Sequence, residues 1–276
     1  MLSPGLYVVA TPIGNREDIT LRALRTLAEA DHVAAEDTRR SGLLLKHHGI
    51  EAKFISLHEH NEEERIPGLL DSIRKGEAVA LVSDAGTPLV SDPGFRLVRA
   101  ASEADLPVFP VPGASALTAA LSVAGLATDR FHFEGFLPAR AAARRKRLEM
   151  LRHAECTTIL YESAHRVEES LDDMALVLGA GRRAVICREL TKQFETVLRG
   201  TLGELQALVA ADSDQRKGEF VILIEGADGE ESAIDGRDLA RALLEFLPAS
   251  QAARVAARVT GGSRREIYAQ LEAGSE

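Results

Sequence analysis

Two nearly repeated turns contain the most suggestive residues of the chain. Residues 81–94 read LVSDAGTPLVSDPG, in which Ser-Asp-x-Gly occurs twice, eight residues apart. Gly86 and Gly94 allow a ligand to approach the backbone closely. Asp84 and Asp92 can cap neighbouring N–H groups or accept ligand hydroxyls. Because the segment has no lysine or arginine, it suits a neutral or cationic ligand better than a polyphosphate; a purely structural double turn is an equal alternative.

Motifs for phosphate or metal binding do not occur in the sequence. There is no GxxxxGK[ST] and no GxGxxG, so neither standard phosphate cradle is expected. His58 and His60 could ligate a cation, but no third ligand has suitable spacing, and we expect a polar loop or dimer surface and no metal site. Cys156 and Cys187 are expected to be buried, reduced thiols.

Ionisable residues follow several other apolar runs. Side chains of these types, at the ends of strands, can accept a proton or grip a phosphate backbone. Ordinary helix caps and ion pairs are the competing interpretation for each of them. The residues are Glu36, Asp37 and Arg39, then Glu162 and Arg166, then Arg188, Glu189 and Lys192.

A basic segment stands out against a net charge of −9. That net charge argues against non-specific coating of nucleic acid, but it leaves a specific RNA partner open, because charges are screened over ~8 Å at physiological salt. We expect residues 139–151 to form a helix that docks RNA, with a merely solvated face as the alternative. Its charges are Arg140, Arg144, Arg145, Lys146 and Arg147 against Glu149, a local sum of 5 − 1 = +4.

The pattern of apolar runs predicts an α/β fold. Strands are expected at 5–10, 32–35, 53–57, 78–83 and 108–111, separated by helices, which indicates a mostly parallel sheet. Open sheets of this kind bind ligands at the carboxyl ends of their strands. TPIGN, AEDTR and the double turn would meet there, because each follows one of these strands.

The second half of the chain alternates less regularly, which predicts a mixed sheet. Expected strands are 131–136, 157–162, 184–188, 194–200 and 219–225, and a hinge is expected around 110–113. Residues 227–236 have the composition of a linker, and three short helices at 237–247, 250–259 and 263–272 are compatible with a helix-turn-helix-like unit. The expected domains are therefore 1–112, 113–226 and 237–276.

Composition sets further limits. A chain of 276 residues suggests about two domains of ordinary size. No apolar run reaches the ~18 residues of a membrane span, and the first residues lack the basic start of a signal peptide, so a cytoplasmic protein is expected. Aromatic residues make up 4% with no tryptophan, so an aromatic platform is not expected to dominate nucleic-acid binding.

Ten short motifs occur in one order along about residues 6–268. They are TPIGN, EDTR, HEHNE, SDAGTPLVSDPG, VPGASAL, FEGFLP, YESAHR, CRELTKQFE, RGTL and GEFV. In this order they resemble the ribosomal small subunit methyltransferase I family, in the tetrapyrrole methylase-like, class III group of S-adenosylmethionine (SAM) methyltransferases. Each motif alone is weak, but the ordered set is specific. YESAHR departs from many relatives by Ala164 in place of proline, which changes loop stiffness and not chemistry.

The resemblance implies an activity and partners. Members transfer a methyl group from SAM to the ribose 2′-oxygen of a cytidine in the decoding region of 16S rRNA, in the 30S subunit. It also implies a homodimer, and two α/β domains with SAM in the cleft between them. The double turn would then be the SAM-binding loop, and Gly113, Ser115 and Ala116 at a helix N-terminus would favour the methionine carboxylate.

The resemblance and the chemistry of the residues together give a set of expected roles. Glu36 or Glu189 would accept the proton of the 2′-hydroxyl, and Arg39, Arg166 or Lys192 would grip the RNA backbone. Arg39 and Lys192 are counted with the two carboxylates as the expected catalytic residues. RNA contacts are expected from Arg144, Arg145, Lys146, Arg147 and Arg166. Cofactor contacts are expected from Pro12, Gly14, Asp84, Gly86, Thr87, Asp92, Ser115, Ala116, Glu162, Leu190, Gly218 and Val221.

Two alternatives remain open from the sequence. A tetrapyrrole (precorrin or uroporphyrin) C-methyltransferase would share the fold, but such enzymes usually have a GxGxGD-like first loop where TPIGN stands here. A non-catalytic SAM-sensing or RNA-binding module of ribosome assembly is the second. The carboxylates at three strand ends argue mildly against it.

Overall fold

The computed structural model describes residues 1–227 and 236–273, with side chains described as far as Leu271. By its internal contacts the chain divides into two compact units. Unit 1 consists of Met1–Arg152 and Cys156–Glu225, and unit 2 of His153–Glu155 and Gly226–Glu276. Unit 1 contains both β-sheets, so the boundary expected near residue 112 stays a prediction. The expected linker at 227–236 falls mostly outside the described residues.

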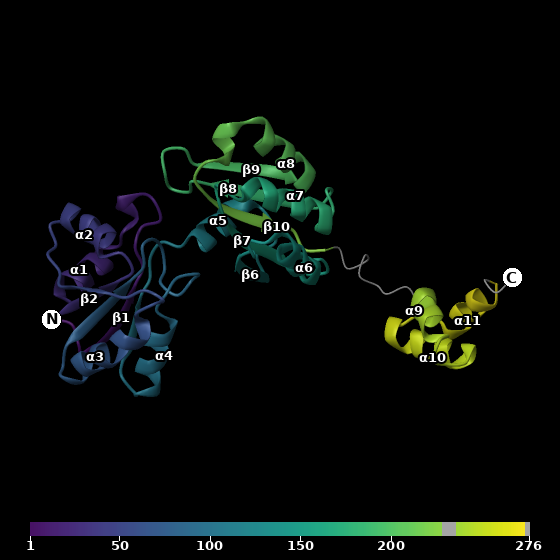
Figure 1. Cartoon of the computed structure of the whole chain (residues 1–276), viewed down its shortest axis with the longest axis horizontal. Helices are drawn as coiled ribbons and strands as arrows, with labels where there is room; N and C mark the ends of the chain where they lie inside the picture. Colours follow the sequence, from purple (N-terminus) through teal and green to yellow (C-terminus); the bar gives the residue numbers. More distant parts are fainter. Residues whose placement is uncertain (228–235, 274–276) are drawn as a thin grey trace. The chain divides into compact units, whose positions relative to one another are not determined.

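The first sheet is parallel throughout, as expected. Its strand order is β3-β2-β4-β1-β5, and β4 in the centre is fully buried, which explains its uninterrupted apolar sequence. Helices α3 and α4 lie together beside the sheet (Figure 1). The strands are β1 (Gly5–Val9), β2 (His32–Ala35), β3 (Phe54–Ser56), β4 (Ala78–Val82) and β5 (Val108–Val111); the helices are η1 (Arg16–Asp18), α1 (Leu21–Glu29), α2 (Thr38–His47), α3 (Glu62–Arg74) and α4 (Phe95–Glu103).

Local caps explain where the first helices begin. The Thr20 side chain accepts the N–H of Ala23 at 3.0 Å, and the Asp37 carboxylate accepts the N–H of Arg39 at 2.9 Å. Serine, threonine and aspartate are the residues that satisfy free N–H groups at a helix start. Both caps directly follow a loop at the sheet edge, so they fix the path of TPIGN and AEDTR.

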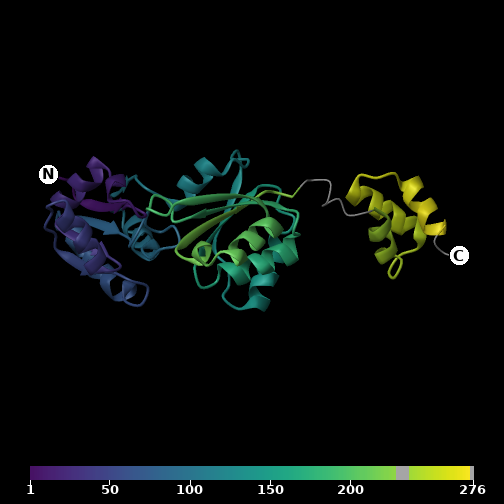
Figure 2. The same cartoon turned by 90° about the horizontal axis from the view of Figure 1, so that it is seen from above.

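The second sheet is mixed, which confirms that prediction. Its order is β6-β7-β10-β8-β9, with β6 and β7 parallel and the other pairs antiparallel. One face packs against α6, α7 and α8 and the other against α5 (Figure 2). The elements are α5 (Ala116–Ala124), β6 (Phe131–Phe136), α6 (Ala141–Leu151), β7 (Thr157–Ser163), α7 (Val167–Leu178), β8 (Arg183–Arg188), β9 (Thr196–Thr201), α8 (Leu202–Ala211), η2 (Ser213–Arg216) and β10 (Glu219–Ile224).

Unit 2 contains three short helices close to the expected ranges. They are α9 (Gly236–Leu243), α10 (Ala249–Thr260) and α11 (Arg264–Ala273). Small side chains dominate its core, which is built from Ala240, Ala253, Ala256, Ile267 and Leu271. No helix within residues 1–227 and 236–273 combines the length and hydropathy that a membrane span requires.

Candidate active site

A cavity of about 290 Å³ in unit 1 is lined by loops from both sheets. The first sheet contributes the TPIGN loop and the double turn, and the second contributes the ends of β7, β8 and β10. Many residues expected from the sequence lie on its wall: Gly86, Thr87, Asp92, Ser115, Ala116, Glu162, Leu190, Lys192, Gly218 and Val221. Pro12, Gly14, Glu36, Arg39, Asp84 and Glu189 are not part of that wall.

The double turn is tied to the TPIGN loop by backbone hydrogen bonds. Thr11 donates its N–H to the carbonyl of Gly86 at 2.8 Å, and Gly86 donates to the carbonyl of Thr11 at 3.0 Å. Gly86 adopts φ 82°, and an added β-carbon would lie 3.3 Å from the Ile13 side chain. A glycine is therefore needed both for the backbone conformation and for the close approach.

Two loops of the cavity hold non-glycine residues in the left-handed region. Within the described residues, five non-glycine positions have positive φ, and four of them belong to these loops. They are Leu89 (74°) and Ser91 (64°) in the double turn, and Glu189 (51°) and Thr191 (67°) in CRELTK. Such conformations cost on the order of 1–3 kcal/mol each and persist where surrounding structure imposes them, often at functional sites.

Carboxylates gather at the ends of β2 and β4. Burial raises the pKa of Asp92 to about 6, a hydrogen bond from Ser83 opposes this, and the charge of Asp84 adds to it. The pKa of Glu36 is also raised, by burial and then by the charges of Asp84, Asp92 and Glu59. Of these carboxylates Asp92 lies on the cavity wall, and a cation bound there would favour its ionised form. Among the described residues, no group of three or more His, Cys, Asp or Glu is placed to hold a metal ion.

Glu189, which is not part of the cavity wall, forms a closed network with Lys192 and Glu219, which line it. The Glu189 carboxylate accepts Lys192 Nζ at 2.8 Å and the Glu219 N–H at 3.0 Å, and Lys192 also donates to the Glu219 carboxylate at 2.9 Å. Burial alone would raise the pKa of Glu189, but these hydrogen bonds outweigh it and the pKa is lowered. An added β-carbon on Gly218 would lie 2.5 Å from this carboxylate. Glu189 therefore shapes the loop and is a weak base.

The basic helix α6 is less available to RNA than its sequence suggests. For Arg144 the expectation of an RNA contact is wrong, because its side chain is 2% exposed and its Nε donates to Asp173 at 2.6 Å. Asp173 also accepts Nε of Arg145 at 2.6 Å, and Arg147 pairs with Glu134. Lys146 is exposed and forms no ion pair with any side chain that the structure describes.

The YESAHR turn is also tied internally. The Glu162 carboxylate is buried and accepts the Ser163 N–H at 2.8 Å and the Ser170 hydroxyl at 2.5 Å. Arg166 donates to Glu162 at 3.3 Å and to the Leu137 carbonyl at 2.6 Å. The carboxylate of Glu162 is therefore a structural group on the cavity wall.

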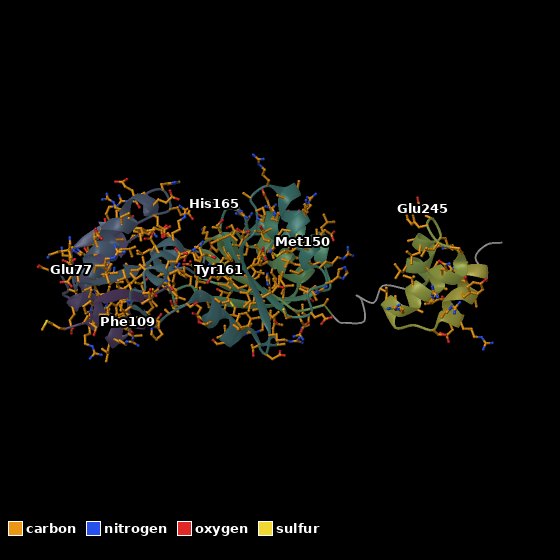
Figure 3. The ribbon with its side chains drawn as sticks, turned by 90° about the horizontal axis from the view of Figure 1, so that it is seen from below. Glu77, Phe109, Met150, Tyr161, His165 and Glu245 are labelled. Atoms are coloured by element: carbon orange, nitrogen blue, oxygen red, sulfur yellow. The ribbon has the colours of Figure 1, made fainter. Side chains whose placement is uncertain are left out.

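Tyr161 is a cavity residue that the sequence reasoning passed over. Its hydroxyl accepts the Leu117 N–H at 3.1 Å, near the start of α5. Burial raises its pKa, so the phenol stays neutral. Figure 3 shows Tyr161 within the second sheet. The available signal was its place in YESAHR, near the carboxyl end of a strand and next to Glu162, which was expected to contact the cofactor.

Comparison with known proteins decides the family. The family model of tetrapyrrole (corrin/porphyrin) methylases matches residues 5–206, and that of the RsmI C-terminal HTH domain matches residues 230–273. The protein named ribosomal RNA small subunit methyltransferase I is 53% identical in Xylella fastidiosa strain Temecula1, covering 97% of this chain and 99% of that protein. The corresponding Pseudomonas aeruginosa protein is 52% identical, with 96% and 95% covered. The chain belongs to the ribosomal RNA small subunit methyltransferase I family.

Solved structures place this family member in the tetrapyrrole methylase fold. The methyltransferase CobJ superposes with a TM-score of 0.60 at 20% identity, covering 82% of this chain and 95% of that chain. Uroporphyrin-III C-methyltransferase from Thermus thermophilus, solved with S-adenosylhomocysteine, gives 0.56 at 22% identity, covering 79% and 96%. Together with the family match, they indicate a SAM-dependent methyltransferase.

Proposed function

We propose that this chain transfers the methyl group of SAM to the ribose 2′-oxygen of a cytidine in the decoding region of 16S rRNA. Relatives at 45–53% identity bear the name ribosomal RNA small subunit methyltransferase I. Solved structures of tetrapyrrole enzymes and of a cobalamin-synthesis related protein resemble the chain at only 18–22% identity. This difference favours an rRNA substrate over a tetrapyrrole.

The charges and sizes of the side chains on the cavity wall support SAM as the cofactor. Its wall combines Asp92 with small residues such as Gly86 and Ser115. Among the described residues, Lys192 is the one basic side chain that lines it. SAM has a sulfonium and an ammonium group and no phosphate, so it matches such a wall. The carboxylate of its methionine would lie near Ser115, at the N-terminus of α5, where the helix dipole favours an anion.

Methyl transfer requires the 2′-oxygen, the methyl carbon and the sulfur to lie in a line, and positioning supplies ~7–11 kcal/mol of such barriers. Glu36 is the better proton acceptor of the two expected carboxylates, because its pKa is raised whereas that of Glu189 is lowered. Lys192 keeps its charge, since hydrogen bonds to Glu189 and Glu219 raise its pKa more than burial lowers it. It would stabilise the developing alkoxide.

Docking of the ribosomal subunit would use exposed basic side chains of unit 1. Lys146 and the partly exposed Arg145, Arg147 and Arg166 remain available to phosphates. Arg39, whose side chain is 88% exposed, pairs with Asp37 and with no other carboxylate in the part of the chain that the structure describes. We assign these side chains to the RNA backbone of an assembled 30S subunit. The working form is proposed to be a homodimer in the cytoplasm.

Transfer of a labelled methyl group tests the proposal. The protein is given methyl-labelled SAM with 30S subunits from a strain that lacks it, with deproteinised 16S rRNA, or with uroporphyrinogen III. Label is expected in the rRNA of the subunits and not in the tetrapyrrole. Label in the tetrapyrrole alone, or SAM binding without transfer to any RNA, would overturn it.

A further inference from the structure

A β-bulge in β6 sets the direction of Phe136, the last residue of that strand. In the parallel pairing of β6 with β7, Phe133 lies opposite Ile159, Gly135 opposite Leu160 and Phe136 opposite Tyr161, so Glu134 is an extra residue. Side chains alternate between the two faces of a regular strand, so residues three apart would point to opposite faces. The bulge instead puts Phe136 on the same face as Phe133, the face that carries the cavity.

The bulge depends on a glycine that touches the double turn. Gly135 has φ 74°, and an added β-carbon would lie 3.0 Å from Oγ of Ser91. Ser91 itself has φ 64°. Two unusual backbone conformations from different sheets thus meet at the mouth of the cavity, and their joint effect is to fix the position of Phe136.

Phe136 is half-exposed, and its ring packs against the ring of Tyr161. Its side chain is 53% exposed although it lines the cavity. Its ring meets that of Tyr161 edge to face, with centroids 5.7 Å apart at 67°, and Tyr161 meets Phe133 at 5.0 Å and 68°. Tyr161 is in turn anchored by the Leu117 N–H. The exposed ring is therefore preorganised for a partner.

Its place on the cavity wall distinguishes Phe136 from the other exposed phenylalanines. The described side chains include five strongly exposed ones, Phe95, Phe131, Phe136, Phe194 and Phe246, and only Phe136 lines this cavity. A cavity of about 290 Å³ is at the small end for ligand sites. With a cofactor inside, the nucleotide must approach from the mouth, where Phe136 lies.

We propose that Phe136 stacks on the base of the nucleotide whose ribose is methylated. The inference rests on the proposed RNA methylation. Sequence-specific RNA-binding proteins commonly take unstacked bases of single-stranded segments and stack them on aromatic side chains. An unstacked nucleotide held in this way can bring its ribose to a methyl group inside the cavity. Every base has a π-face, so this contact positions the nucleotide without selecting cytidine. A single exposed ring would therefore stack on the base, although the chain has few aromatic residues overall.

Three variants and one control test the assignment. Phe136→Leu keeps an apolar side chain but removes the π-face, whereas Phe136→Tyr and Phe136→Trp keep it. Phe131→Leu is the matched control, because Phe131 is 44% exposed on the same strand but does not line the cavity. The measurements are KM and kcat for 30S subunits, the affinity for S-adenosylhomocysteine by calorimetry, and the oligomeric state by sedimentation.

Phe136→Leu is expected to raise KM for the subunit about tenfold, the size of one lost base–aromatic contact, with cofactor affinity and oligomeric state unchanged. The tyrosine and tryptophan variants and Phe131→Leu should behave like the wild type. The inference would be overturned if the leucine and tyrosine variants lost equal activity, or if the leucine variant had wild-type kinetics. It would also be overturned if Phe136→Leu weakened cofactor binding or changed the oligomeric state. A wild type inactive on every RNA would instead remove the proposed function itself.

Discussion

Gly14 and Lys192 approach each other so closely that a β-carbon on Gly14 would lie 2.4 Å from Cγ of Lys192. The contact joins the TPIGN loop to the CRELTK loop. Lys192 cannot move aside freely, because its ammonium group is held by both Glu189 and Glu219. The lysine of the cavity wall is therefore positioned from two directions.

Gly14→Ala should displace Lys192 and reduce kcat/KM by about tenfold or more, because small misplacements of reacting groups are costly. Steady-state kinetics on 30S subunits measures this. Gly68→Ala is the control, since Gly68 lies inside helix α3 with open space around it. That change should leave kinetics unaltered and add about 0.5–1 kcal/mol of stability. Unchanged kinetics in Gly14→Ala would show that the contact is unimportant.

The affinity for SAM should depend on pH through Asp92. With a folded pKa of about 6, against 3.8 for a free side chain, Asp92 is largely protonated at pH 5 and ionised at pH 7. A cation in the cavity favours the ionised form, so binding releases a proton at low pH. Affinity should fall about tenfold from pH 7 to pH 5 and be nearly constant above pH 7.

Calorimetry across this pH range, in buffers of different ionisation enthalpy, detects both the affinity and the released proton. Asp92→Asn should bind more weakly at pH 7 and show no such dependence. The same raised pKa makes Asp92 a stability cost that grows as the pH rises from about 4 to about 6. Asp92→Asn should therefore be more stable than the wild type at pH 7, and a less stable variant would contradict the burial of this charge.

Two variants of Glu189 separate a base from a positioning residue. Glu189→Gln keeps an oxygen for the Glu219 N–H and Lys192, so it should retain most of kcat, whereas Glu189→Ala should lose much more. A general base would instead lose about 10²–10⁴-fold in both variants. Single-turnover methyl transfer distinguishes the two patterns, and equal loss in the glutamine and alanine variants would restore Glu189 as the base.

Much of the fold followed from the sequence, because apolar runs and their lengths report burial directly. The burial of Arg144 did not, since a run of four cations from Arg144 to Arg147 covers a whole helical turn and one member must point inward. Its partner Asp173 lies on another helix. The left-handed backbone of Leu89 and Thr191 likewise has no local signal, because neither residue prefers that conformation.

Arg144 and Lys146 should differ sharply although they lie on the same helix. Arg144→Ala leaves Asp173 buried with one fewer partner and should cost ~3–5 kcal/mol of unfolding free energy. Lys146→Ala should change stability by less than about 0.5 kcal/mol. Urea unfolding measures both, and a small cost for Arg144→Ala would contradict a structural role.

The salt dependence of RNA binding should also differ between variants of Lys146 and Arg144. If Lys146 contacts a phosphate, Lys146→Ala should reduce the slope of log affinity against log salt by about 0.7. A folded variant such as Arg144→Lys should leave that slope unchanged, because the buried position does not face RNA. A titration of labelled 16S fragments at several salt concentrations supplies the slopes, and identical slopes for Lys146→Ala and wild type would exclude the contact.

The nature of the methylated atom tests the central claim most directly. Labelled rRNA from the transfer reaction is digested to nucleosides and resolved by chromatography and mass spectrometry. Label in 2′-O-methylcytidine, from one position of the decoding region, is the expected result. Label in a base-methylated nucleoside, or spread over many positions, would contradict the assignment of the cavity to ribose methylation.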